Sequence, residues 1–124
     1  MAARLTLTTI NLDAGDPASL ARFYSYLLGW PIAREEPDDV FLTNPDGGIT
    51  LSFQRERGHA RPVWPAKQGD QQMQIHLELL VDDLQAGLAH ALRCGATMAP
   101  YQPQPDVRVC LDPAGHPFCL WVES

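Results

Sequence analysis

The sequence predicts an α+β fold in which two tandem βαβββ units form a curled, eight-stranded mixed sheet, a cup with both helices packed on its outer face. Three observations carry this prediction. One pattern occurs twice, so that residues 8–16 (TTINLDAGD) match residues 75–83 (IHLELLVDD), and residues 44–51 (NPDGGITL) match residues 112–119 (DPAGHPFC). Each copy contains one amphipathic helix, and the strand side chains alternate between an aliphatic face and a polar or reactive face.

The two copies define the expected domain organisation. A length of 124 residues predicts one domain. We divide it into a half-module at residues 1–55, a linker at 56–74 and a second half-module at 75–124. The repeat spacings are 67 and 68 residues, and they place Thr9 opposite His76 and Leu51 opposite Cys119.

Each half-module begins with a strand that leads into a helix. Asp16 can cap the first helix, Pro17 suits its first position, and Gly29 ends it. In the second half Asp82 or Asp83 caps the helix and Gly95 stops it. Apolar residues at helical spacing form one stripe on each predicted helix: Leu20, Phe23, Tyr24, Leu27 and Leu28 in the first, and Leu84, Leu88, Ala91 and Leu92 in the second.

Three short extended segments complete each half-module. In the first half we expect them near residues 31–34, 40–43 and 49–55, and in the second near 97–101, 107–111 and 118–123. The segments at 31–34 and 97–101 carry the weakest signal, because they are short and Pro-rich stretches follow them.

The linker is rich in Arg, Pro, Gly and Gln, and we interpret it as a solvated connection. The alternative is a lid whose apolar residues 63–65 (VWP) cover a ligand cavity, because structureless loops of this length are often functional.

Strand alternation also predicts a functional face. Ile10 and Leu12 lie opposite Thr9 and Asn11, and the aliphatic residues of the fifth and last strands lie opposite polar or reactive ones. The second face contains Thr9, Asn11, His76, Glu78, Cys119 and Trp121. Simple solvent exposure accounts poorly for a Trp and a Cys, whereas a cavity lined by this face accounts for all six.

Composition excludes several classes of function. The net charge of −6 disfavours nucleic acid and anionic membranes as partners. No apolar stretch approaches the length of a membrane span, and the first residues lack the apolar core of a secretion signal. Three cysteines without metal-knuckle spacing indicate free thiols in a reducing compartment, so we expect a cytoplasmic protein.

The motifs at residues 16–17 (DP), 20–24 (LARFY), 28–30 (LGW), 81–84 (VDDL) and 112–120 (DPAGHPFCL) resemble the glyoxalase-like branch of the vicinal oxygen chelate superfamily. This superfamily includes glyoxalase I, extradiol dioxygenases, fosfomycin-resistance enzymes and bleomycin-resistance proteins. The resemblance covers nearly the whole chain and implies the fold described above, together with homodimerisation. It does not imply one reaction, because one fold hosts many functions.

The resemblance also implies where a metal would bind. Metal-using members take His, Gln or Glu ligands from the first, fourth, fifth and eighth strands, and those positions are Thr9, Leu51, His76 and Cys119 here. His76 alone is a usual ligand, so we expect no standard metal centre. A divalent ion held by His76, Glu78, Cys119 and water is the alternative, although residues two apart on a strand lie roughly 6.5–7 Å apart.

We therefore expect a metal-independent, small-molecule-binding protein, by analogy with the bleomycin-resistance proteins. Its cavity would be lined by Thr9, Asn11, Leu51, Phe53, His76, Glu78, Cys119 and Trp121. The alternative is an enzyme, a lyase, isomerase or dioxygenase-like protein that uses a non-standard metal or His76 as acid or base with Glu78 tuning it. A structural or interaction module is the third class, and it leaves the reactive face unexplained. His76 could equally be a structural residue of the sheet, and Cys119 is better interpreted as a small buried hydrophobe than as a nucleophile.

Overall fold

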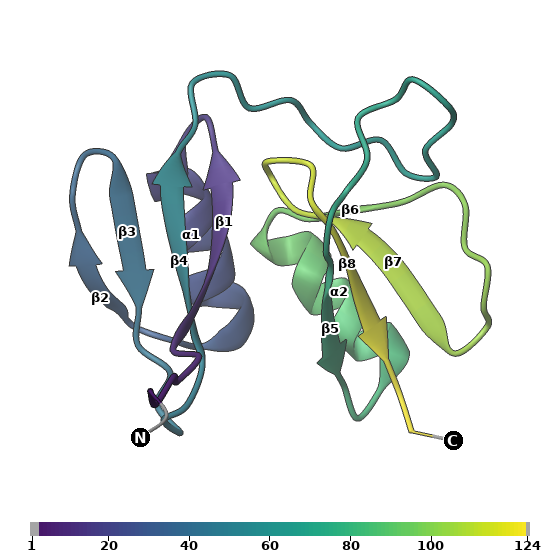
Figure 1. Ribbon diagram of the computed structural model, residues 1–124. Coiled ribbons are helices and arrows are strands. Elements are labelled where there is room, and N and C mark those ends of the chain that lie inside the picture. The colour runs from purple at the N-terminus through teal and green to yellow at the C-terminus, as the bar shows by residue number, and fades with distance from the viewer. Residues whose placement is uncertain (1–2, 124) are drawn as a thin grey trace. The chain divides into compact units, whose positions relative to one another are not determined.

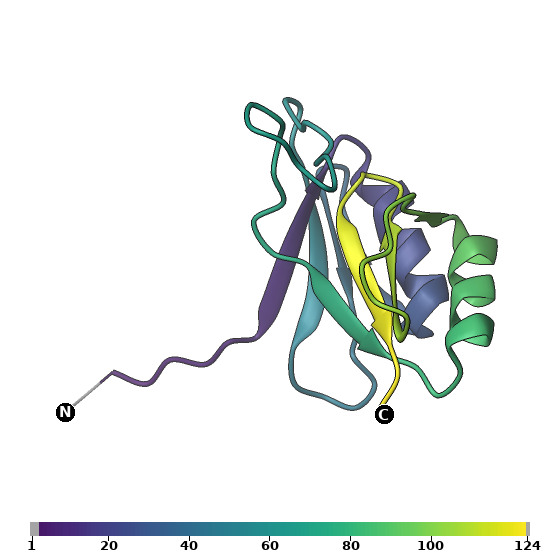
Figure 2. The same ribbon diagram turned by 90° about the vertical axis from the view of Figure 1, so that its right-hand side faces the viewer.

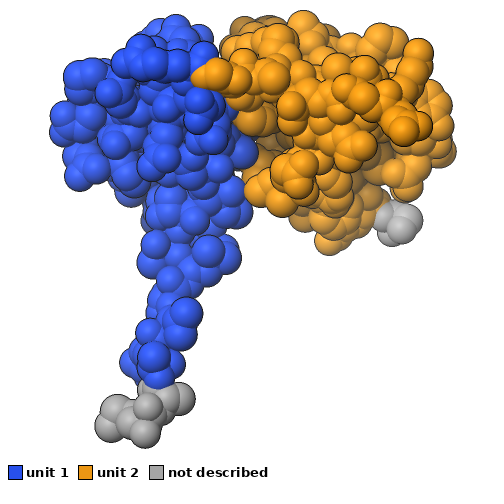
Figure 3. Space-filling model, turned by 45° about the horizontal axis from the view of Figure 1, so that its top comes forward, with its two compact units in different colours: residues 1–57 blue, residues 58–124 orange. Residues whose placement is uncertain are grey.

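A computed structural model describes residues 3–123. The chain divides into two compact units, residues 1–57 (unit 1) and residues 58–124 (unit 2), coloured blue and orange in Figure 3. Each unit contains one helix and one four-stranded mixed sheet (Figure 1). The predicted tandem βαβββ organisation of an α+β fold is therefore confirmed.

Unit 1 pairs its first and last strands at the edge of the sheet. The strand order is β1-β4-β3-β2, with β1 parallel to β4 and the other pairs antiparallel. The elements are β1 (Thr9–Ala14), α1 (Pro17–Leu28), β2 (Ile32–Glu35), β3 (Asp39–Leu42) and β4 (Thr50–Arg55).

Helix α1 begins and ends at the predicted residues. The Asp16 carboxylate accepts a hydrogen bond from the amide of Ser19, and the helix ends at Gly29. Leu20, Phe23 and Tyr24 of the α1 stripe are buried, and the Tyr24 ring stacks on Phe53 with ring centroids 5.7 Å apart. This contact makes one aromatic core for unit 1.

Unit 2 repeats the topology with the order β5-β8-β7-β6, and β5 is parallel to β8. The elements are β5 (Leu77–Leu80), α2 (Leu84–Cys94), β6 (Thr97–Met98), β7 (Val107–Leu111) and β8 (Pro117–Trp121). Helix α2 lies against one face of this sheet (Figure 2). Strand β6 stops at Met98, short of the expected residue 101, and Pro100, which has no amide hydrogen for a ladder, follows soon after.

Helix α2 begins at a capping aspartate and packs closely against the end of β5. Asp83 rather than Asp82 is the cap, because its carboxylate accepts from the amide of Ala86. At Gly87 an added Cβ would lie 2.9 Å from Cγ1 of Val81, so the helix approaches the end of β5 more closely than a side chain would allow. The apolar face of the sheet lies on the α2 side, and its residues Phe118 and Leu120 are buried.

The segment predicted to be a solvated linker is mostly exposed, and several of its side chains contact unit 2. The imidazole Nε2 of His59 lies 2.8 Å from the carbonyl oxygen of Ala114, and the Arg61 guanidinium donates to the carbonyl of Pro113 at 2.7 Å. Trp64 stacks on Tyr101 with ring centroids 5.4 Å apart. The segment is therefore exposed over most of its length, and these three side chains attach it to the rest of unit 2.

Within residues 3–123, no helix combines the length and apolar character that crossing a bilayer requires.

Candidate functional site

A cavity of about 410 Å³ lies within unit 2 on the sheet face opposite α2. It collects all four second-half residues that the sequence assigns to the functional face: His76, Glu78, Cys119 and Trp121. The register of the parallel pair explains this, because Glu78 pairs with Cys119 while their neighbours Leu77 and Phe118 point to the helix side. The sequence places these four residues on one face, and the structure places them around one cavity.

Strand β7 and the loop before it form a second wall. Val109 pairs with Cys119 and Val107 with Trp121, so both valines lie on the cavity face. Pro103 and Gln104 extend this wall from the loop that connects β6 to β7. Sequence reasoning did not assign these residues to the site, although Val107 and Val109 show the same alternation used for β8.

Two side chains hold the loop in place. The amide of Gln102 donates to the carbonyls of Ala99 and Val109, and its oxygen accepts from the amide of Val109 at 2.8 Å. The Arg108 guanidinium donates to backbone carbonyls of the same loop, with a shortest distance of 2.8 Å to Val107. The cavity wall is therefore tied to the strand that follows it.

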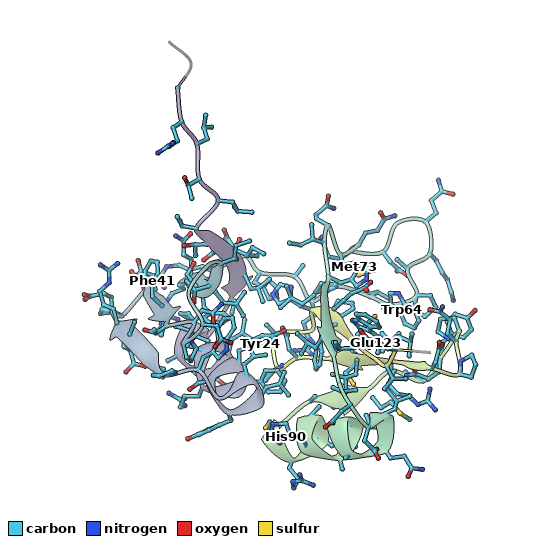
Figure 4. All side chains as sticks on the ribbon, turned by 90° about the horizontal axis from the view of Figure 1, so that it is seen from below. Tyr24, Phe41, Trp64, Met73, His90 and Glu123 are labelled. Carbon is cyan, nitrogen blue, oxygen red and sulfur yellow. The ribbon has the colours of Figure 1, made fainter. Side chains whose placement is uncertain are left out.

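Trp64 and Met73 supply the third wall, from the segment between β4 and β5 (Figure 4). Trp64 is held by its stacking on Tyr101, at 26° between the ring planes. Of residues 63–65, which the lid interpretation named, Trp64 lines this cavity and Val63 and Pro65 do not. Met73 is a residue that sequence reasoning missed, and its sulfur adds a soft, polarizable surface.

The polar centre of the site is a histidine–carboxylate contact. Nε2 of His76 lies 3.1 Å from Oε2 of Glu78, and the side chains are 34% and 60% exposed. His76 directly precedes β5 and Glu78 lies within it, and the tips of their side chains converge. When Nε2–H donates to Glu78, a neutral imidazole keeps its lone pair on Nδ1, which can accept a hydrogen bond.

Cys119 is a protonated thiol at neutral pH. Burial raises its pKa above the ordinary value of 9.0, and the negative charge of Glu78 raises it further. Burial also raises the pKa of neighbouring Cys110, to about 11. Because the thiolate is the nucleophile and the metal ligand, Cys119 presents a small apolar surface to the cavity.

The predicted site residues of unit 1 are divided between two faces. Thr9 and Asn11 lie on the face opposite α1, where the Ser52 hydroxyl donates to Oδ1 of Asn11 at 3.0 Å. Leu51 and Phe53 are on the helix side, 4% and 0% exposed, so their assignment to the cavity face is wrong.

One extra residue in the first-half turn causes this error. In both turns an Asn or Asp side chain accepts from the amide two residues later, which makes Asn44 equivalent to Asp112 and Gly47 to Gly115. After Gly47 the chain has both Gly48 and Ile49 before Thr50 pairs with Thr9. Gly47 and Gly48 both have positive φ, which accommodates the longer turn.

The insertion changes the matched positions. Ser52 pairs with Asn11 as Cys119 pairs with Glu78, so Ser52, rather than Leu51, is the counterpart of Cys119. A single inserted residue moves every following side chain to the other face of a strand.

The side chains at these positions do not fit a divalent metal cofactor. In unit 1 they are hydroxyl and amide groups: Thr9, Asn11 and Ser52. In unit 2 they are one imidazole, one carboxylate and a thiol whose pKa is raised. Across residues 3–123, no three His, Cys, Asp or Glu side chains are grouped so that they could hold a metal ion.

A second hollow in unit 2 is larger, about 790 Å³, and more open to solvent. It lies between the start of α2 and the end of β8, and its lining includes Leu80, Asp82 and Val122. We place the site at the smaller cavity, because imidazole, thiol and indole groups converge there and none of them lines the larger hollow.

Comparisons with known proteins agree with this fold. The family model described as a glyoxalase-like domain matches residues 9–121. A glyoxalase/bleomycin resistance protein/dioxygenase family enzyme from Burkholderia phytofirmans PsJN is 18% identical, with 95% of this chain and 98% of that chain covered and a TM-score of 0.69. The fosfomycin resistance protein FosX from Mesorhizobium loti is 16% identical, with 100% and 95% covered and a TM-score of 0.66.

A third structure is TnmS3, an antibiotic binding protein from Streptomyces sp. CB03234. It is 16% identical, the match covers 100% of this chain and 100% of that chain, and the TM-score is 0.65. No curated protein sequence matches the chain. At these identities the structural likenesses show the fold, which an enzyme and an antibiotic binding protein share.

Proposed function

The chain belongs to the glyoxalase-like domain family, and we propose that it is a small-molecule-binding protein that holds its ligand in the unit 2 cavity without a metal. The observation that carries this proposal is the composition of the cavity. Two indoles, a thioether, valines and prolines surround one histidine–carboxylate contact. Small-molecule sites commonly have this form, with mostly apolar walls and a few polar groups that orient the ligand.

The state of the reactive side chains supports binding over covalent chemistry. The thiol of Cys119 has a raised pKa, so it is a poor nucleophile at neutral pH. TnmS3, which shares the fold, is described as an antibiotic binding protein. For this chain we accordingly propose a ligand that is bound and released unchanged.

A thermal-shift screen tests the proposal, because a ligand that binds only the folded state raises the apparent melting temperature. Hits are then measured by calorimetry on the wild type and on Trp121→Ala. Trp30→Phe is the matched control, because Trp30 follows α1 in unit 1 and lies outside the cavity. We expect Trp121→Ala to weaken binding and Trp30→Phe to leave it unchanged. Equal effects of both variants would contradict a ligand in this cavity.

The second candidate function is metal-free acid–base catalysis, and the His76–Glu78 contact favours it. A carboxylate that accepts from one imidazole nitrogen leaves the other nitrogen to act as a general base. Mass spectrometry of each hit after prolonged incubation separates the two functions. Recovery of the unchanged compound supports binding alone. A product that forms with the wild type but not with His76→Gln establishes catalysis.

We also propose that the protein is cytoplasmic and that it forms a homodimer. The three cysteines form no disulfide in the structure, which suits a reducing compartment. Light scattering of the purified protein measures the assembly, and a monomeric mass across the working concentrations would contradict the dimer.

A further inference from the structure

We propose that the cavity selects aromatic compounds that carry a positively charged nitrogen, with the cation directed at Glu78. This inference rests on the proposed function and specifies the chemical class of its ligand. Glu78 is a carboxylate at the polar centre of the cavity, and no lysine or arginine is among the lining residues. Apart from the imidazole of His76, an anionic ligand would meet this carboxylate without a basic side chain in the lining.

Two arginines of unit 2 form hydrogen bonds outside the cavity. Arg108 is on the strand that supplies Val107 and Val109, but its guanidinium donates to the carbonyls of Gln104, Pro105 and Val107. The guanidinium of Arg61 donates to the carbonyl of Pro113. Both hydrogen-bond to backbone carbonyls, and neither lines the cavity.

His76 leaves part of the carboxylate available. The imidazole contacts Oε2 of Glu78 at 3.1 Å, and a carboxylate has further lone pairs on Oε1. The Glu78 side chain is 60% exposed, so it keeps much of its hydration before a ligand arrives. A ligand ammonium group could therefore form a charge-assisted hydrogen bond at Oε1.

The walls suit the remainder of such a ligand. Trp64 and Trp121 offer indole surfaces, which attract both aromatic rings and cations, and Met73 adds a polarizable sulfur. The net charge of −6 favours the approach of a cation over that of an anion. Local and long-range electrostatics thus favour the same class of ligand.

Three probes with one ring system test this inference: 2-naphthylmethylammonium, 2-naphthylmethanol and 2-naphthoate. They are positive, neutral and negative at neutral pH. Calorimetry measures the dissociation constant of each. We expect the ammonium to bind about fivefold more tightly than the alcohol, the ratio that corresponds to a partly exposed ion pair, and the carboxylate to bind most weakly. Raising the salt concentration to about 0.5 M should reduce the difference between the dissociation constants of the three probes.

Variants of Glu78 locate the origin of the preference. Glu78→Gln should make the ammonium and the alcohol bind alike, and Glu78→Asp should retain part of the preference. Glu35→Gln changes the net charge equally but lies on β2 of unit 1, so it should leave the ratio unchanged. Circular dichroism confirms that each variant is folded.

The outcomes separate this inference from the proposed function. Three results would overturn the inference and still leave a binding cavity. They are equal binding of the three probes, tightest binding of the carboxylate, and a preference for the ammonium that survives in Glu78→Gln. Failure of all three probes to bind also overturns the cationic-aromatic class. The proposed function fails on separate evidence, when the whole screening library gives no saturable ligand that Trp121→Ala weakens.

Discussion

Nε2 of His76 and Oε2 of Glu78 are 3.1 Å apart, and the two residues are separated in sequence by Leu77, the first residue of β5. This contact orients the imidazole toward the cavity that Cys119 and Trp121 also line. In unit 1 the counterparts of Glu78 and Cys119 are Asn11 and Ser52, and the Ser52 hydroxyl donates to Oδ1 of Asn11. The two halves share a topology, and the imidazole–carboxylate contact is in the second.

Replacing His76 distinguishes anchoring from catalysis. In a binding protein, His76→Gln keeps a hydrogen-bonding side chain and should weaken ligand binding by about threefold to tenfold, the loss of one hydrogen bond. Calorimetry with a screening hit measures this effect. A large loss of turnover with unchanged affinity would instead assign His76 to catalysis.

Trp64 tests the wall supplied by the segment between β4 and β5. Trp64→Ala removes an indole from the cavity and its stacking on Tyr101, so affinity should fall about tenfold. Val63→Ala is the matched control, because Val63 is adjacent in sequence, exposed, and absent from the cavity lining. Equal affinity of the wild type and Trp64→Ala would show that this segment does not enclose the ligand.

Substitutions in β4 test the corrected register. Leu51 is buried on the helix side of the sheet, so Leu51→Ala should lower the free energy of unfolding by about 2–4 kcal/mol. Ser52→Ala removes one side-chain hydrogen bond to Asn11 and should cost about 1 kcal/mol. Urea denaturation followed by circular dichroism measures both. The reverse ranking would support the register expected from the repeat spacing.

The repeat in the sequence predicts the topology well and the first-half site poorly. Helix caps at Asp16 and Asp83 and strand alternation at His76 and Glu78 are local signals, and the structure retains them. The face of Leu51 depends on the length of a turn, and the spacing of the Pro-x-Gly motifs does not reveal where the added residue is absorbed.

The wall contributed by Trp64 is difficult to predict for a different reason. The segment that contains it has no periodicity, and its position depends on tertiary contacts such as the stacking on Tyr101. Apolar residues within a polar stretch were the available signal. Met73 gave no comparable signal, because a single methionine in such a segment has no pattern to place it.

Cys110 makes the stability of the protein depend on pH in the alkaline range. Its side chain is buried, and its pKa rises from 9.0 to about 11. The folded state therefore holds this proton more tightly than the unfolded state does. The contribution of this thiol to the free energy of unfolding is fully present below about pH 9 and is lost as pH rises toward 11. Its full size is on the order of 1–3 kcal/mol.

Denaturation of the wild type and Cys110→Ala at a series of pH values measures this contribution. The wild type should lose more stability than the variant between about pH 9 and 11, because other groups titrate equally in both. Parallel pH profiles would contradict the burial of a protonated thiol at this position.

The central claim is that a small molecule binds in the cavity of unit 2, and the indole signals of the three tryptophans test it directly. Trp64 and Trp121 line the cavity, while Trp30 is in unit 1. In a ¹⁵N-edited NMR titration with a hit from the screen, the account predicts saturable shifts of the Trp64 and Trp121 signals and an unchanged Trp30 signal. A saturable shift of Trp30 with Trp64 and Trp121 unmoved would contradict it.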